Sequence, residues 1–162
     1  MKKILFLCHG NICRSPMAEA VFKDMAAAAG LADAFEVASA AVSDEETGNP
    51  IYPPAQRCLN RHGIPFDRHR QARRVTAGDY ARYDCLVVMD AMNLRMLRWI
   101  IGEDTQGKVR KMMSFAGIDR DVADPWYSGD FSTAYADILA GCGGLLEYIH
   151  RRTLRISAGG MP

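Results

Sequence analysis

The first strand and the turn that follows it constrain this fold more than any other segment. Residues 2–8 read Lys-Lys-Ile-Leu-Phe-Leu-Cys, an apolar run without the polar alternation of a half-exposed strand. Such a run predicts a strand buried on both faces, in the centre of a parallel sheet. A loop follows, and Pro16 opens an Ala- and Met-rich stretch that predicts a helix. We expect Ser15 to cap this helix, with its inner face including Met17 and Ala28, and Gly30 to end it.

Strands and helices alternate along the rest of the chain. The pattern predicts further strands over 35–40, 83–89 and 109–115, and helices over 56–60, 93–101 and 132–152, with a short helix capped by Thr76. This alternation favours an α/β fold with a parallel, three-layer sheet and right-handed crossovers. The length of 162 residues suits one domain, which we place over 1–155, with a disordered tail over 156–162.

Composition excludes several classes of function. A formal net charge of +1 gives no field for nucleic acid or a membrane surface, and no apolar segment is long enough to span a bilayer. The five cysteines contain no Cys-x-x-Cys pair, and the four histidines show no metal spacing, so we expect no metal and no cofactor. An odd cysteine count without a disulfide framework indicates a reduced, cytoplasmic protein. Cys58, Cys85 and Cys142 read as core residues.

The loop after the first strand carries the chemistry. It leaves the carboxyl end of a central strand, where open α/β sheets bind ligands, and its amides can converge on one point beside a helix amino terminus. Arg14 can add a planar fork to two oxygens of a bound phosphate. The same surroundings stabilise Cys8 as a thiolate, and Ser15 can donate a hydrogen bond to its sulfur. A thiolate under a phosphate cradle is a nucleophile for phosphorus.

Hydrolysis of a phosphate ester also needs a proton donor for the leaving oxygen. Asp124 is the candidate, because it precedes Pro125, which holds it extended, and two aromatic residues, Trp126 and Tyr127. Taken alone, an Asp-Pro turn is usually structural. Together with the Cys8 loop it predicts a general acid.

These motifs resemble those of the low-molecular-weight protein tyrosine phosphatases. The matching stretches lie in the same order along almost the whole chain: residues 6–19, 39–40, 62–64, 72–73, 88–90, 93–94 and 124–127. The resemblance implies a three-layer sandwich with a four-stranded parallel sheet flanked by helices. It implies Cys8 as nucleophile, Arg14 as phosphate clamp and Asp124 as general acid. The phosphate-binding loop would then comprise His9, Gly10, Asn11, Ile12, Cys13, Arg14 and Ser15.

The family also assigns finer roles within that loop. Asn11 would order it through side-chain hydrogen bonds, and Cys13 would form a reversible disulfide with the nucleophile. For Cys13 the alternative is a small loop residue that only packs. The side chain of His9 is expected to point to solvent, leaving only its backbone in the site.

The function implied by the resemblance is hydrolysis of phosphotyrosine, and of aryl phosphates, through a phosphocysteine. The partners would be phosphate or a similar oxyanion and phosphotyrosine-containing proteins, a tyrosine kinase among them. Two alternatives stay open. A thiol-dependent arsenate reductase shares the fold but needs a relay of further cysteines near the third strand, where only Cys85 lies. A catalytically silent anion-binding module would keep the cradle without turnover.

Two charged segments are harder to interpret. Relatives commonly carry a bulky aromatic near the position of Glu45, whereas here residues 44–46 are Asp-Glu-Glu. With Trp126 and Tyr127, Glu45 is predicted to form the substrate lip, and its acidity would disfavour acidic phosphopeptides; a solvated charge run is the alternative. The basic run over 68–74 reads as solvated surface. Arg70, where relatives often carry histidine, is given no role.

Overall fold

The computed structural model describes residues 1–159 and is built on one parallel sheet. Its strands are β1 (Lys2–Cys8), β2 (Phe35–Ala41), β3 (Cys85–Val88) and β4 (Val109–Lys111). They run in the order β2-β1-β3-β4 with every pairing parallel, so β1 is central as predicted. Because all strands point the same way, their carboxyl ends gather at one edge of the sheet. Cys8 is the last residue of β1 at that edge.

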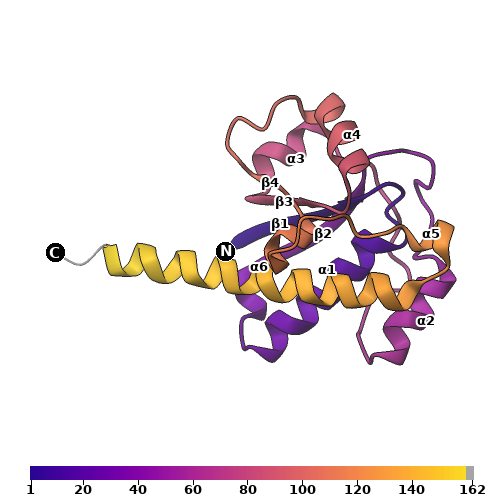
Figure 1. The fold of residues 1–162 in the computed structure, drawn as a ribbon, viewed down its shortest axis with the longest axis horizontal. Coiled ribbons are helices and arrows are strands. Elements are labelled where there is room, and N and C mark those ends of the chain that lie inside the picture. The colour runs from indigo at the N-terminus through magenta and orange to yellow at the C-terminus, as the bar shows by residue number, and fades with distance from the viewer. Residues whose placement is uncertain (160–162) are drawn as a thin grey trace.

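Helices cover both faces of the sheet, which confirms the three-layer α/β fold (Figure 1). The bounds are α1 (Arg14–Ala28), α2 (Pro53–Arg61), α3 (Ala77–Arg82), α4 (Ala91–Ile101), α5 (Pro125–Ser128) and α6 (Phe131–Gly159), with 3₁₀ turns η1 (Ala32–Ala34) and η2 (Met112–Ala116). In Figure 1, α1, α2 and α6 lie on one side of the sheet, and α3 and α4 lie on the other.

The side chains of β1 alternate between two cores. Ile4, Phe6 and Cys8 pack in the cluster that includes residues of α1, α2 and α6. Leu5 and Leu7 pack in the second cluster, with residues of α4. This double burial explains why the strand is apolar throughout.

Glycines in α6 allow an unusually close approach to η2. A Cβ built on Gly144 would lie 2.0 Å from the carbonyl oxygen of Phe115, and one on Gly141 would lie 2.6 Å from Met112 Cε. Gly143 faces open space, with nothing within 4 Å. The expected tertiary support for this glycine-containing helix is therefore direct packing against η2.

Several predicted boundaries need correction. The strand expected over 109–115 ends at Lys111, because the chain then turns into η2 to pack on α6, and the strand expected over 83–89 is β3, Cys85–Val88. Residues 156–159 of the expected tail continue α6, while 160–162 lie outside the described residues.

The prediction for the first helix was right about its end and wrong about its start. Gly30 follows the final cap with φ of 73°, as expected of a C′ glycine. The helix begins at Arg14, so the cap position falls on Cys13 and Ser15 lies inside the first turn. Ala28, expected on the inner face, is exposed. Ser15 is not a cap because its hydroxyl is used in the loop.

Candidate active site

Cys8 lies beneath the loop that joins β1 to α1. Its side chain is buried, and its sulfur accepts a hydrogen bond from the backbone amide of Asn11 at 3.3 Å. Ser15 Oγ lies 3.0 Å from the same sulfur, the contact that the sequence predicted. Both contacts place polar groups at the sulfur, beside the amino terminus of α1.

Asn11 holds the loop in a conformation that few residues adopt. Its φ of 60° is the only positive value among the described non-glycine residues, and asparagine tolerates this left-handed region better than most. The buried amide donates from Nδ2 to Ser15 Oγ at 2.8 Å and to Ser39 Oγ at 2.9 Å. The ordering role that the family resemblance implied for Asn11 matches this network.

Arg70 completes the Asn11 network, although no role was predicted for it from the sequence. Its guanidinium donates to the Asn11 carbonyl at 2.8 Å, to Asn11 Oδ1 at 2.7 Å and to Ser39 Oγ at 3.2 Å. The backbone amide of Arg73 also donates to Asn11 Oδ1, at 3.2 Å. Arg70 and Arg73, within the basic run over 68–74, thus stabilise the loop after Cys8. Only their contacts with Asn11 distinguish them from solvated surface charges.

Arg14 is a buried cation with acceptors on two sides. Its side chain is 2% exposed, and its guanidinium nitrogen Nη1 donates to Asp90 Oδ2 and to the Val122 carbonyl, both at 2.7 Å. The other terminal nitrogen, Nη2, lies 3.4 Å from Asp124 Oδ2. Burial opposes the charge, but Cys8, Asp124 and Asp90 raise the pKa of Arg14 above its ordinary value. The two other N–H groups of the Arg14 guanidinium have no acceptor among the described residues and can donate to a bound anion.

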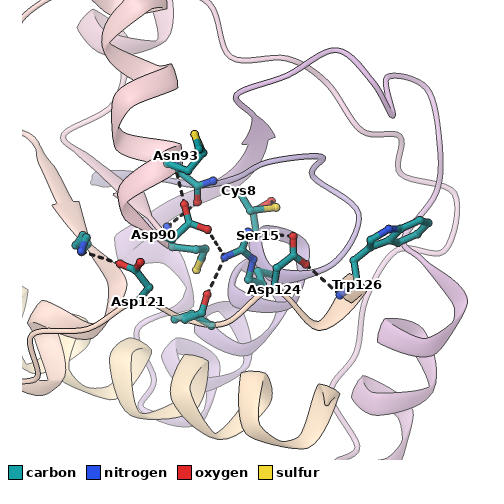
Figure 2. Close-up of polar contacts among 12 residues, drawn as sticks. Cys8, Ser15, Asp90, Asn93, Asp121, Asp124 and Trp126 are labelled. Carbon is teal, nitrogen blue, oxygen red and sulfur yellow. Dashed lines mark hydrogen bonds and ion pairs between the residues drawn. The ribbon is translucent and has the colours of Figure 1, made fainter. Parts of the chain in front are cut away.

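Asp90 fixes the guanidinium from the adjacent strand, as Figure 2 shows. It follows β3 and caps α4, accepting from the Asn93 amide at 2.7 Å through its other oxygen. The Asn93 side chain in turn accepts from the Met89 amide at 3.1 Å. Sequence reasoning placed Asp90 only at the end of a strand. An acid at the carboxyl end of the strand next to β1 was the signal for a site residue.

Asp124 reaches the site on a tethered loop. Val122, fully buried, donates its amide to the Met89 carbonyl at 2.9 Å and accepts from Arg14. Two ion pairs hold the same segment, Lys111 with Asp121 at 2.7 Å and Arg120 with Asp137 at 2.7 Å. Asp124 then caps α5, accepting from the Trp126 amide at 3.0 Å (Figure 2). Its other oxygen faces Arg14.

These side chains line one hollow of about 140 Å³. It is bounded by the loop after Cys8, by the loop after β2 and by the segment that carries Asp124. Its lining residues are Cys8, His9, Gly10, Ile12, Cys13, Arg14, Glu45, Glu46, Asp124, Trp126 and Tyr127. Asn11 and Ser15, predicted as phosphate-binding residues, lie behind this surface and are fully buried. Tyr52, which the sequence did not single out, packs on Trp126 with ring centroids 4.7 Å apart. A cavity of this size suits a phosphate group entering past the rings of Trp126 and Tyr127.

Comparison with known proteins agrees with this geometry. The family model described as low molecular weight phosphotyrosine protein phosphatase matches residues 3–155. The chain belongs to this family. It is 38% identical over 153 residues to the low molecular weight protein-tyrosine-phosphatase YfkJ of Bacillus subtilis, covering 93% of this chain and 97% of that protein. The human low molecular weight phosphotyrosine protein phosphatase is 37% identical over 154 residues, covering 92% and 96%.

Solved structures show the same fold. The crystal structure of YfkJ superposes with a TM-score of 0.89 at 38% identity, covering 94% of this chain and 96% of that one. The crystal structure of SP-PTP from Streptococcus pyogenes gives 0.82 at 34% identity, covering 91% and 93%. The chain is therefore a protein-tyrosine phosphatase by family, a phosphoric monoester hydrolase.

The lip of this low-molecular-weight phosphatase includes a hydrogen bond that corrects the expectation for His9. The imidazole Nε2 of His9 lies 2.9 Å from Glu45 Oε2, so the side chain is paired rather than free in solvent. The backbone of His9 is also engaged, since its carbonyl accepts from the Ser43 amide at 3.1 Å and the Ser43 hydroxyl at 2.9 Å. The loop that carries Ser43 and Glu45 is thus hydrogen-bonded to His9, the residue that follows Cys8.

The phosphatase has a second cysteine in the hollow. Cys13 lines it together with Cys8, and both are free thiols. Burial, followed by the negative charges of Cys8 and Asp124, raises the pKa of Cys13 far above its ordinary value. Cys58 and Cys142 are core residues as predicted, and Cys85 is half-buried in β3 at the start of the strand, away from the hollow.

Across the described residues of this phosphatase, no group of three or more His, Cys, Asp or Glu side chains is arranged to hold a metal ion. Within the same residues, no helix is long and apolar enough to cross a bilayer.

Proposed function

We propose that Cys8, Arg14 and Asp124 carry out the hydrolysis of phosphotyrosine and aryl phosphates. The observation that carries the proposal is that a buried sulfur, a guanidinium and a carboxylate line the same 140 Å³ hollow. In the first step the Cys8 sulfur forms a bond to phosphorus as the bond from phosphorus to the tyrosine oxygen breaks. The departing oxygen takes the proton of Asp124, giving a phosphocysteine and a neutral phenol.

The second step returns the enzyme to its starting state. Asp124, now ionised, takes a proton from water as the water oxygen attacks phosphorus and the sulfur leaves as thiolate. Arg14 and the loop amides stabilise the charge on the equatorial oxygens in both steps. Because Arg14 Nη1 donates to Asp90 and to the Val122 carbonyl, the guanidinium is oriented before substrate binds. This lowers the reorganisation needed to reach the transition state.

The lip supports a preference for phosphotyrosine flanked by basic residues. Trp126 is 50% and Tyr127 84% exposed at the entrance, where an aromatic substrate ring can pack against them. Glu45, with its side chain 65% exposed, and the neighbouring Glu46 place negative charge at the same entrance. Like charges repel acidic peptides and attract basic ones. The substrates are then phosphotyrosine proteins, among which we include a tyrosine kinase.

Two further parts of the proposal concern the cysteines. We propose that Cys13 forms a reversible disulfide with Cys8, supported by their place in one hollow. All five cysteines are free thiols, which supports a reducing, cytoplasmic location. The arsenate reductase alternative is disfavoured, because Cys58, Cys85 and Cys142 do not line the hollow that holds Cys8 and Cys13. A silent anion-binding module is the alternative that turnover decides.

Hydrolysis of p-nitrophenyl phosphate and phenyl phosphate tests the assignment. Cys8→Ser should abolish turnover of both while still binding inorganic phosphate. Asp124→Ala should slow phenyl phosphate by roughly 10²–10⁴ and p-nitrophenyl phosphate, a better leaving group, by less. Equal rates for Asp124→Ala and the native enzyme on phenyl phosphate would remove the general-acid role. No hydrolysis by the native enzyme, with thioredoxin-coupled arsenate reduction instead, would overturn the proposal.

Substrate choice needs a separate measurement. The Cys8→Ser variant can be used to trap phosphotyrosine peptides from a panel that varies the charge of flanking residues. Basic flanks should be retained best, and Glu45→Gln should narrow the difference between basic and acidic peptides. A panel ranking unchanged by Glu45→Gln would remove the lip from the specificity assignment.

A further inference from the structure

A second cavity lies at the amino-terminal edge of the sheet, the edge opposite Cys8. Its volume is about 270 Å³, larger than the active-site hollow. Its walls come from the start of β1, from the residues entering β3 and β4, and from the carboxyl-terminal half of α6. Figure 1 shows the amino terminus beside α6 at this end of the molecule. None of the proposed catalytic residues lines this cavity, so the proposed function does not use it.

Positive charge dominates the lining. Lys2, Lys108, Arg110 and Arg152 contribute four cationic side chains, and Asp84 contributes the one carboxylate. Such a concentration is notable in a chain whose formal net charge is +1. Convergent cations around a cavity attract anions more strongly than scattered surface charges do.

Arg110 is held rigidly and has no carboxylate partner among the described residues. Its guanidinium carbon lies 4.2 Å from the ring centre of Phe115 and 4.8 Å from that of Tyr148. Contact with the faces of two rings restrains the guanidinium but leaves its charge unneutralised. Because the side chain is half-buried, water compensates this charge only in part. A fixed, partly desolvated guanidinium is suited to a phosphate oxygen pair.

Neutral groups orient two of the other cations. Lys108 Nζ donates to the Tyr80 carbonyl at 2.7 Å, and the Arg152 guanidinium donates to the Tyr148 hydroxyl. The single carboxylate is already engaged, since Asp84 accepts from the Lys3 amide at 2.8 Å. Asp104, on the loop before β4, does not line the cavity and is bound by the Tyr80 hydroxyl and nearby amides. Lys108, Arg110 and Arg152 are therefore oriented without a carboxylate partner among the described residues.

We propose that this cavity is a second anion site, which binds a small molecule bearing two or more phosphate charges. Four cations and one carboxylate give the cavity an excess of positive charge, which a polyanion neutralises better than a single phosphate does. The volume admits a diphosphate group between Arg110 and Lys108, with Lys2 and Arg152 at the rim, where both are exposed. The site goes beyond the proposed function, and either can fail without the other.

Residue-resolved NMR titration with inorganic pyrophosphate tests the site. Because the active site also binds phosphates, two sets of amide signals are followed: Gly107 and Lys108 for the second cavity, Gly10 and Asn11 for the hollow. We expect two saturation curves with different dissociation constants. The double variant Lys108→Gln with Arg110→Gln should weaken binding at the second cavity at least tenfold and leave the hollow unchanged. Arg98→Gln, an exposed charge on α4, is the matched control and should change neither.

Three results would overturn the site. One is the absence of saturable shifts at Gly107 and Lys108. Another is shifts of equal size with sodium chloride at matched ionic strength. The third is an unchanged dissociation constant in the double variant. Should that variant fail to fold, Lys2→Gln serves in its place, since this side chain is exposed at the start of β1. It should weaken binding at the second cavity by a smaller factor, and an unchanged constant would again count against the site.

Discussion

The Arg70 guanidinium donates to both the carbonyl and the side-chain oxygen of Asn11, at 2.8 and 2.7 Å. Asn11 is the residue held at φ of 60°, and its own amide points at the Cys8 sulfur. Arg70, 59 positions further along the chain, therefore holds Asn11 in its strained backbone conformation beside Cys8.

Arg70→Lys should reduce kcat for p-nitrophenyl phosphate by about tenfold or more. Lysine keeps the charge but cannot span both oxygens, and hydrogen bonds from a charged group contribute about 1.5–3 kcal/mol. Steady-state kinetics and the inhibition constant of inorganic phosphate measure the effect. Arg68→Lys, an exposed neighbour in the same run, is the control and should match the native enzyme. An unaltered kcat in Arg70→Lys would mean that Asn11 holds its conformation unaided.

Gly144→Ala should lower the melting temperature by many degrees or prevent folding, although alanine favours helices by about 1 kcal/mol over glycine. The added Cβ would fall 2.0 Å from the Phe115 carbonyl oxygen, so α6 and η2 would have to separate. Gly143→Ala places the same group in open space and should raise the melting temperature by a few degrees. Thermal unfolding of the two variants provides the comparison, and a shift of the same sign in both would contradict this packing.

Asp90→Asn should lower kcat/KM by at least tenfold with a smaller change in stability. Asparagine is a good helix cap, so α4 keeps its start, while the buried Arg14 loses its charged partner at 2.7 Å. Kinetics and thermal unfolding are measured on the same preparations. Asp130→Asn, a substitution at another aspartate that accepts from a helix-start amide, at Thr133, controls for the cap alone and should leave kcat/KM unaltered. A parallel loss in both variants would show that the ion pair is not what matters.

Oxidation of Cys8 by excess peroxide should be fully reversible only when Cys13 is present, because the disulfide protects the Cys8 sulfenic acid from irreversible further oxidation. Peroxide converts the Cys8 thiolate to sulfenic acid with release of hydroxide, and the Cys13 sulfur then displaces the oxygen as water to form a disulfide. Since burial and the neighbouring negative charges raise the pKa of Cys13, the fraction of thiolate, and with it the rate of disulfide formation, should still rise as pH passes 8. Intact mass and recovery with dithiothreitol report the outcome. Two free thiols after inactivation, or full recovery of Cys13→Ser, would exclude the disulfide.

The sequence predicted the fold class and the central site residues because each has a local signature. The apolar β1, the loop after it and the Asp-Pro turn at Asp124 are contiguous patterns, and the order of strands follows from their alternation with helices. Ser15 was assigned as a cap on the same kind of pattern and was misassigned, because α1 already begins at Arg14 and the Ser15 hydroxyl contacts Cys8 and Asn11.

The supports of the site could not be predicted in this way. Arg70 in a basic run and Asp90 before a helix look identical to a solvated charge and an ordinary cap, and their partners lie 59 and 76 residues away. The end of β4 was misjudged for a related reason. Residues 112–115 have strand-like composition, but the fit of η2 against Gly141 and Gly144 decides their conformation.

The anchoring of Val122 has a consequence for the timing of proton transfer. This residue is bound at its amide by Met89 and at its carbonyl by Arg14, and Asp124 follows only two positions later. The proposed proton donor is therefore not carried on a flap that must shut over the substrate. Raising the solvent viscosity with sucrose should leave the rate constant of the first chemical step unchanged, in contrast to enzymes whose turnover is limited by lid closure.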